Sequence, residues 1–246
     1  MKKTIFISIF FLLSFQQIDN LPKYSFNKGK QYYLKGNYKL AIIELTKTIN
    51  LDSSFAEAYF IRSSSYSHLM DYKNALSDLE KYIIFKPFDP EGFINLSQLR
   101  CYANVPVGSM DTTKEYNSTK MSYQIFILSL KDIDQAIKLD SLNSESYFLK
   151  AEYLSEICEN HLSSSCDSIF NQAINLYTKV LKLDSSNYAA YFNRANIKLM
   201  SGDTIGACID FHRRMNKDSN CKSALDILCE ISNNEKIKKR FCSGLP

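Results

Sequence analysis

Three stretches of the chain nearly restate one another, and this internal repetition limits the fold more than any other feature. The segments are INLDSSFAEAYF from Ile49, IKLDSLNSESYF from Ile137 and LKLDSSNYAAYF from Leu181. Each one reads as the end of a helix, an aspartate-serine turn and the aromatic start of a following helix. Such self-similarity is typical of chains that stack one supersecondary unit many times.

The composition favours long helices joined by short turns. Only 7 glycines and 5 prolines occur among 246 residues, whereas sheet-rich folds need many turn residues. Apolar residues recur at helical spacing rather than at every second position. One helix pair cannot bury its apolar face alone, so successive pairs must stack to form a core. The sequence therefore predicts an all-α solenoid.

The repeat resembles the tetratricopeptide repeat (TPR), a helix-turn-helix unit of 34 residues. That family has a bulky residue at repeat position 4, a small one at 8, alanine at 20, and aromatic or leucine residues at 11 and 24. The best match carries Tyr59, Ser63, Tyr66, Ala75, Leu79 and Pro87 at positions 4, 8, 11, 20, 24 and 32. The resemblance implies a superhelix of about five repeats across residues 22–221, namely 22–55, 56–89, 90–143, 144–187 and 188–221.

Two of these repeats are longer than the others. Phe93, Tyr147 and Tyr191 all take position 4, yet they are 54 and 44 residues apart instead of 34. The third repeat therefore carries about 20 extra residues and the fourth about 10. Both ends of each repeat match the pattern, so each insertion is expected at the turn between its two helices. The first should span Ala103 to Tyr123, and the second should centre on HLSSSC.

The two ends of the chain are expected to lie outside the repeats. Residues 1–17 have two lysines, then an apolar run of about twelve residues, then two glutamines. That run is too short for a bilayer span and has the layout of a secretory signal peptide; the alternative is a buried first helix. We therefore expect an exported protein, periplasmic or secreted, whose only encounter with a membrane is export and whose signal is cleaved. Residues 222–246 are predicted to form a capping helix and tail.

Export changes the interpretation of the seven cysteines. An oxidising compartment permits disulfides, and an odd number leaves at least one cysteine over. Cys158 and Cys166 flank the expected turn of the fourth repeat, where two antiparallel helices could bring them to bridging distance. This pair is the predicted disulfide. In the cytosol the same residues would instead be small buried hydrophobes.

No catalytic or metal-binding pattern stands out. The glycines are scattered, and neither a Gly-x-Ser-x-Gly elbow nor a His-Glu-x-x-His helix is present. Cys158, His161 and Cys166, like Cys208 with His212, are too few for a four-ligand zinc site. We expect a protein that is not an enzyme, with no cofactor, metal or small-molecule substrate. The net charge of +4 comes without a basic stripe, so no nucleic-acid partner is expected.

The resemblance also implies where a partner would bind. In the family, the first helix of each repeat lines a concave groove with positions 2, 5, 6, 9, 12 and 13. Aromatic residues recur here at position 5 with amides beside them, a mixture that suits an extended peptide or a helix. The alternative is that the side chains at position 5 are partly buried and pack against neighbouring helices. The candidate groove residues are Phe26, Asn27, Lys30, Phe60, Ile61, Ser64, His68, Asn95, Gln98, Phe148, Glu152, Phe192, Asn193 and Asn196.

The sequence thus predicts an exported scaffold that binds a peptide or protein partner in the groove of its repeats. A first alternative is a component of an envelope assembly or secretion machinery. A second alternative is a metal-thiol module or an enzyme built on the two insertions.

Overall fold

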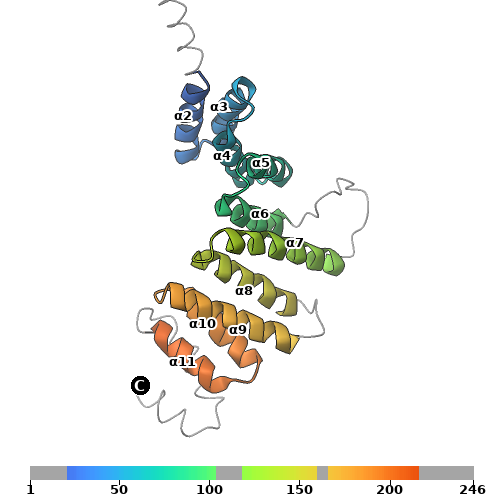
Figure 1. Cartoon of the computed structure of the whole chain (residues 1–246), viewed down its shortest axis with the longest axis vertical. Coiled ribbons are helices and arrows are strands. Elements are labelled where there is room, and N and C mark those ends of the chain that lie inside the picture. The colour runs from blue at the N-terminus through green and yellow to red at the C-terminus, as the bar shows by residue number, and fades with distance from the viewer. Residues whose placement is uncertain (1–20, 104–117, 160–165, 216–246) are drawn as a thin grey trace, which may run out of the picture. The chain divides into compact units, whose positions relative to one another are not determined.

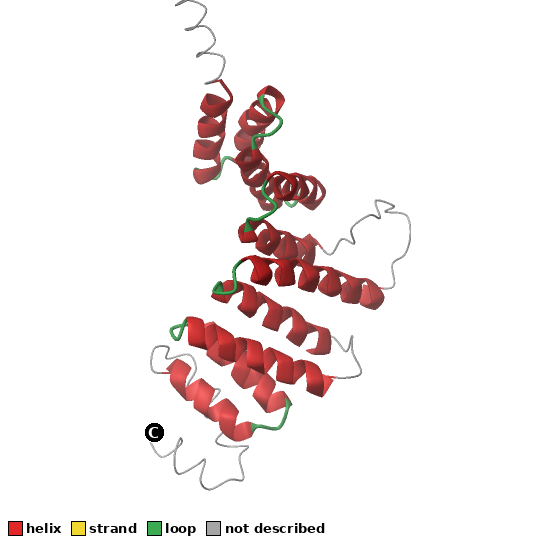
Figure 2. Cartoon of the chain, viewed as in Figure 1, coloured by secondary structure: helices red, strands yellow, loops and turns green. Residues whose placement is uncertain are grey.

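The computed structural model describes residues 21–103, 118–159 and 166–215, and every regular element in these ranges is an α-helix (Figure 1; Figure 2). The expected all-α fold is confirmed. The chain divides into two compact units, residues 1–105 and 106–246, and each is described by itself.

The described residues of the first compact unit, 21–103, form five helices joined by short turns. Each helix packs against the next one along the chain, and the first helices of two neighbouring pairs, α2 and α4, also touch. The helices are α2 (Leu21–Leu34), α3 (Tyr38–Leu51), α4 (Ala56–His68), α5 (Tyr72–Phe85) and α6 (Pro90–Ala103).

The second compact unit repeats this arrangement. Again consecutive helices pack on one another, and α8 touches α10 across the pair boundary. Its described helices are α7 (Ser118–Leu139), α8 (Ser144–Glu159), α9 (Cys166–Leu183), α10 (Tyr188–Met200) and α11 (Thr204–Met215).

The expected insertions are partly helical. Helix α7 begins at Ser118, so residues 118–123 of the expected insertion from Ala103 to Tyr123 are helical. In the fourth repeat, α8 and α9 have 16 and 18 residues, compared with 13 and 14 in α4 and α5. The boundary between the compact units falls inside the third expected repeat. The signal peptide (1–17) and the capping helix and tail (222–246) lie outside the described residues.

Small residues occupy two positions of every expected repeat. At position 20 the side chains are completely buried, and at position 8 they are buried or nearly so. A small side chain at both places lets the two helices of a pair approach closely, which is what fills the core without voids. Position 20 is Ala41, Ala75, Ser129, Ala173 and Ala207, and position 8 is Gly29, Ser63, Ser97, Ala151 and Ala195.

Two contacts show how close the approach is. In α4 the Ser63 hydroxyl donates a hydrogen bond of 2.7 Å to the backbone carbonyl of Ala75 in α5. In α2 a Cβ on Gly29 would lie 2.7 Å from Cγ of Leu45, closer than two carbons can pack. A larger residue at either place would therefore force the helices apart.

A half-buried arginine joins three helices in each compact unit and binds a buried aspartate. Arg62 in α4 donates two hydrogen bonds of 2.7 Å to the carboxylate of Asp78 in α5 and one of 2.9 Å to the hydroxyl of Thr46 in α3. In α10, Arg194 makes the equivalent bonds to Asp210 in α11 and Thr178 in α9, at 2.5–2.8 Å. We call these two groups the arginine ties.

The sequence analysis missed the arginine ties, although the chain carries a signal for them. In both, the arginine lies sixteen residues after the threonine and sixteen before the aspartate. Lys28 and Glu44 have the same separation and form a salt bridge of 2.9 Å. A base at repeat position 7 followed by an acid at position 23 is thus a recurring link between the two helices of a repeat.

The first prediction is that Arg62→Met lowers the free energy of unfolding by about 3 kcal/mol, because it leaves the buried Asp78 carboxylate without its counter-charge. The double variant Arg62→Met, Asp78→Leu should recover most of that loss. Urea unfolding measures both. As a control, Lys86→Met removes only an exposed ion pair with Glu57 and should change stability by less than about 0.5 kcal/mol. Equal losses in the single and double variants would contradict the tie.

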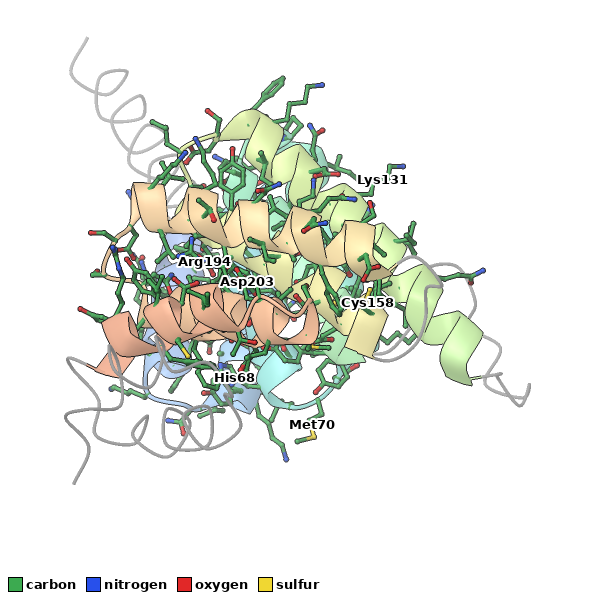
Figure 3. All side chains as sticks on the ribbon, turned by 90° about the horizontal axis from the view of Figure 1, so that it is seen from below. His68, Met70, Lys131, Cys158, Arg194 and Asp203 are labelled. Carbon is green, nitrogen blue, oxygen red and sulfur yellow. The ribbon has the colours of Figure 1, made fainter. Side chains whose placement is uncertain are left out.

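In the repeats without an insertion, the turn between the two helices contains a residue with positive φ. Gly36 and Gly202 have φ of 74° and 82° there, but the equivalent residue in the second repeat is Met70, with φ of 60°. Left-handed backbone costs a non-glycine residue about 1–2 kcal/mol. The Met70 side chain is 76% exposed and projects away from the helices (Figure 3), so packing does not repay this cost.

The second prediction is that Met70→Gly raises the free energy of unfolding by about 0.5–1 kcal/mol. The substitution removes the backbone strain, but glycine also gives the unfolded chain more conformational entropy, which offsets part of the gain. Thermal and urea unfolding of the variant test this. Gly36→Ala is the reverse exchange at the matching turn, where a Cβ meets no atom within 4 Å, and it should destabilise through φ alone. A stabilising Gly36→Ala would show that the backbone angle is not the cause.

Candidate functional site

The aromatic residues at repeat position 5 pack inside their own repeats. The ring centroid of Phe26 is 4.7 Å from that of Phe55, and Phe60 lies 4.8 Å from Tyr82. In the second compact unit the ring pairs are edge-on, Phe148 with Tyr177 at 5.6 Å and Phe192 with Phe211 at 5.7 Å. All four position-5 rings are half-buried. They contribute to packing, and Phe60 also lines a cavity.

The first cavity lies between α4 and α6 in the first compact unit and has a volume of about 360 Å³. It brings together five of the predicted groove residues: Phe60, Ser64, His68, Asn95 and Gln98. The other lining residues are Tyr33, Ser63, Ser67, Leu79, Leu99 and Tyr102. No carboxylate, lysine or arginine is among these lining residues.

Local contacts fix several side chains around this first cavity. The Ser64 hydroxyl donates to the Phe60 carbonyl at 3.1 Å, and the Asn95 amide donates to the Glu91 carbonyl at 2.9 Å. At the rim, the His68 imidazole stacks on the ring of Tyr38 with centroids 4.2 Å apart and planes 8° from parallel. The cavity is therefore lined by aromatic rings, hydroxyls and amides whose backbone supports are rigid helices.

The second cavity lies between α8 and α10 in the second compact unit, with a volume of about 260 Å³. Three predicted residues line it: Glu152, Asn193 and Asn196. The Asn193 amide donates hydrogen bonds to Oε1 of Glu152 at 3.3 Å and to the hydroxyl of Tyr177 at 3.2 Å. The other lining residues are Ser155, Glu156, Tyr177 and Ile197.

The second cavity is acidic. Glu152 and Glu156 are four residues apart on α8 and therefore share one face of the helix. Burial raises the pKa of Glu152, the negative charge of Glu156 raises it further, and the hydrogen bond from Asn193 lowers it in part. The two carboxylates thus face the same space in an environment that disfavours their combined charge.

The remaining predicted groove residues do not line either cavity. Asn27 and Lys30 are exposed on α2, and Ile61 is half-buried against the core of the first compact unit. The position-5 rings outside the first cavity belong to the packing described above. The predicted groove residues thus fall into three groups. The cavity-lining residues are Phe60, Ser64, His68, Asn95, Gln98, Glu152, Asn193 and Asn196. Asn27 and Lys30 are exposed, and the packing residues are Phe26, Ile61, Phe148 and Phe192.

The predicted disulfide partners lie at the two ends that flank residues 160–165. Cys158 is buried near the end of α8, and Cys166 is the half-buried first residue of α9. Their pairing stays a prediction. His161, the third member of the metal-like group, lies outside the described residues.

Several other lining residues occupy repeat positions that face the groove in the family. Tyr33, Ser67 and Ser155 are at position 12, and Tyr102 and Glu156 are at position 13. Tyr177 comes from α9, a second helix of its repeat, which the groove positions do not include.

Two features of the described residues bear on other functions. No helix in them is long and apolar enough to cross a membrane. No three histidine, cysteine, aspartate or glutamate side chains within the described part of the chain come together as metal ligands would.

Sequence comparison finds a distant relative. No protein-family model matches the chain. A DnaJ homolog subfamily C member 7 homolog from Dictyostelium discoideum is 26% identical over 153 residues, which are 62% of this chain and 25% of that protein. The chain therefore spans about a quarter of the length of this curated relative.

Structural comparison identifies the fold. MamA from Desulfovibrio magneticus RS-1 superposes with a TM-score of 0.63 at 13% identity, covering 81% of this chain and 98% of that one. YrrB, described as a TPR protein with an unusual peptide-binding site, has a TM-score of 0.60 at 16% identity and coverages of 82% and 90%. A thermophilic TPR protein from Thermus thermophilus, TTC0263, has a TM-score of 0.57 at 13% identity, with 85% and 100% covered. The chain has the TPR fold, an all-α solenoid.

The third prediction concerns the charge of the second cavity. Glu156→Gln should lower the pKa of Glu152, because it removes the nearby negative charge, whereas Asn193→Ala should raise it by removing a hydrogen bond to the carboxylate. Carboxyl ¹³C NMR titration measures both. Glu145→Gln, on the exposed first turn of the same helix, is the matched control and should leave the pKa of Glu152 unchanged. A pKa that stays constant in Glu156→Gln would show that the carboxylates do not interact.

Proposed function

We propose that this protein is a scaffold that binds an extended segment of another protein in the cavities between the first helices of its repeats. The observation that carries the proposal is the first cavity, where five side chains predicted from repeat positions converge around about 360 Å³. Three lie on α4 and two on α6, helices of different repeats.

The lining of the first cavity suits a peptide. An extended peptide brings unpaired backbone donors and acceptors, which the Asn95 and Gln98 amides and the serine hydroxyls can satisfy. The Phe60 ring and Tyr102, which is 75% exposed, supply the apolar contact that dominates binding energy in most interfaces. A cavity without charged lining also avoids the cost of burying unpaired charges.

The comparisons support a binding role by analogy. YrrB has the same fold, and its description names a peptide-binding site. A catalytic role would need a nucleophile, base or metal held in a cavity. The lining of the first cavity offers hydroxyls, amides and one histidine whose ring is stacked on Tyr38. We therefore propose binding rather than catalysis.

We also propose that the scaffold is exported. The support is the order of two lysines, an apolar run and a polar exit in residues 1–17, which lie outside the described residues. Export would place Cys158 and Cys166 in a compartment that permits their proposed disulfide. Mass spectrometry of the protein recovered from a bacterial periplasm or medium, without reductant, would detect a cleaved N-terminus and the linked peptides. An uncleaved chain with alkylated thiols would overturn both.

The fourth prediction tests the binding site. Peptides selected from a random dodecamer phage library against the whole chain should lose about thirtyfold in affinity for Tyr102→Ala and for Gln98→Ala, by isothermal titration calorimetry. The matched control is Phe88→Ala, which also removes an exposed ring (83% exposed) from the first compact unit, away from the cavity. It should bind normally.

Circular dichroism should show that these variants keep their helix content, because the three side chains are exposed or half-buried. If Phe88→Ala weakens binding while both cavity variants bind like the wild type, the peptide occupies another surface and the proposed site is wrong.

A further inference from the structure

The first helix pair concentrates the positive charge of the chain. Residues 21–51, which form α2, α3 and the turn between them, contain six lysines and one glutamate, a net charge of +5. The whole chain has a net charge of +4, so the other residues sum to −1. No arginine occurs in this pair. The six lysines are Lys23, Lys28, Lys30, Lys35, Lys39 and Lys47.

Helices α2 and α3 pack side by side (Figure 1) and present one common face. The Glu44 carboxylate of α3 accepts a hydrogen bond of 2.9 Å from Nζ of Lys28 in α2 and one of 3.0 Å from Nζ of Lys47 in α3, so both lysines lie on this face. Residues three, four or seven positions away from them lie on the same side of their helices. We call this surface the end face, and it consists of Leu21, Tyr24, Lys28, Leu40, Lys47 and Leu51.

The apolar residues of the end face are exposed, although a later repeat covers the matching place. In the third repeat, position 3 is Gly92, where a Cβ would lie 3.0–3.1 Å from two side chains of α5 in the preceding repeat. In the first repeat the same position is Tyr24, which is 68% exposed. Leu21, Leu40 and Leu51 are 51%, 45% and 48% exposed. Four large apolar side chains therefore lie in solvent beside the lysines.

Three further lysines surround the end face. Lys23 and Lys39 are exposed and directly precede Tyr24 and Leu40 in the sequence, and Lys35 is exposed in the turn after α2. No acidic side chain in the described part of the chain forms a salt bridge with any of the three. Their long alkyl stems let the charged heads extend past the apolar side chains. The end face thus combines exposed apolar groups with positive charge.

We propose that the end face binds the surface of an anionic lipid membrane. The leucine and tyrosine side chains enter the boundary between headgroups and acyl chains, and the lysines around them bind the negative headgroups. Tyrosine is enriched at that boundary, because its ring is apolar and its hydroxyl is polar. A peripheral contact of this kind goes beyond the expectation that export is the chain's only encounter with a membrane.

The composition of the end face favours lipid over other partners. A nucleic acid would engage the lysines but leave the three leucines in water, since phosphate contacts dominate its binding. Protein interfaces are enriched in arginine and depleted in lysine, whereas the cations of this helix pair are all lysines. A second copy of the chain would bring lysines against lysines, because a two-fold contact pairs a patch with itself.

The first test uses a fluorescent reporter. The chain has no tryptophan, so a single introduced indole reports on its own surroundings. In the whole chain, the emission of Tyr24→Trp should move to shorter wavelength when vesicles of phosphatidylcholine with about 30% phosphatidylglycerol are added, and should stay constant with phosphatidylcholine alone. The matched control is Phe88→Trp, at a residue 83% exposed in the same compact unit outside the end face, whose emission should stay constant in both.

Vesicle co-sedimentation then measures the contribution of charge and of apolar contact. Lys47→Gln should weaken binding to the phosphatidylglycerol vesicles about fivefold, while Glu44 keeps its bond to Lys28. Lys81→Gln changes the net charge equally at the matching position of the second repeat and should bind like the wild type. Leu40→Gln should weaken binding about tenfold, whereas Ile84→Gln, at an exposed residue of α5, should not.

Three outcomes would overturn the proposal. Residues 1–17 are present in every variant, so binding through their apolar run would leave Lys47→Gln and Leu40→Gln at the wild-type affinity. Equal emission shifts in the two tryptophan variants would show that contact is not made through the end face. Binding of poly-glutamate or RNA, but not of vesicles, with a loss in Lys47→Gln would identify an acidic polymer as the partner instead.

The membrane contact and the proposed function fail separately. Tyr102→Ala and Gln98→Ala alter the first cavity, so they should weaken the selected peptides and leave vesicle binding unchanged. Leu40→Gln should do the reverse, because Leu40 is not among the residues that line the first cavity.

Discussion

The close approach of paired helices is the constraint on which the rest of this structure depends. Two helices can touch through their backbones only where both side chains at the crossing are small, and every expected repeat supplies them at positions 8 and 20. The Ser63 hydroxyl reaches the Ala75 carbonyl, and Gly29 leaves room for Leu45, for this reason. The aromatic side chains are too large for these close contacts, so they pack in the space between successive helices and complete the core.

The arginine ties add a directional restraint to this packing. Apolar contacts allow a helix to rotate by some degrees at small cost, but a bidentate guanidinium-carboxylate pair with a third bond to threonine does not. Arg62 and Arg194 each hold a first helix between the second helices of two repeats. The same helices carry the cavity residues Ser64 and Asn193 on other faces, so each tie also determines which side chains point into the cavity. Because taking two charges out of water carries a desolvation cost, such a pair adds less to net stability than its geometry alone suggests.

The two compact units use one architecture to present two chemistries. Their cavities arise from the same repeat positions, yet hydroxyls and amides line the first and a pair of carboxylates lines the second. Exchanging side chains at positions 9 and 13 leaves positions 8 and 20 untouched. Recognition can therefore vary without disturbing the contacts that stabilise the helix pairs. This separation of packing positions from binding positions lets a repeat scaffold carry different sites along its length.

The sequence by itself determined the fold class, because helical periodicity and small residues at a fixed spacing are local properties. It also predicted two lengthened repeats, since Tyr147 and Tyr191 mark the same position at an irregular spacing. Only the tertiary structure decided which groove positions stay open to a partner. Phe192 and Ser64 both belong to the predicted groove, but Phe192 meets Phe211 of the second helix, whereas Ser64 lines a cavity. A repeat position defines the face of a helix on which a residue lies, while its exposure depends on the side chains that the neighbouring helix brings against it. The arginine ties arise for the same reason, from side chains on separate helices that meet only after the repeats have stacked.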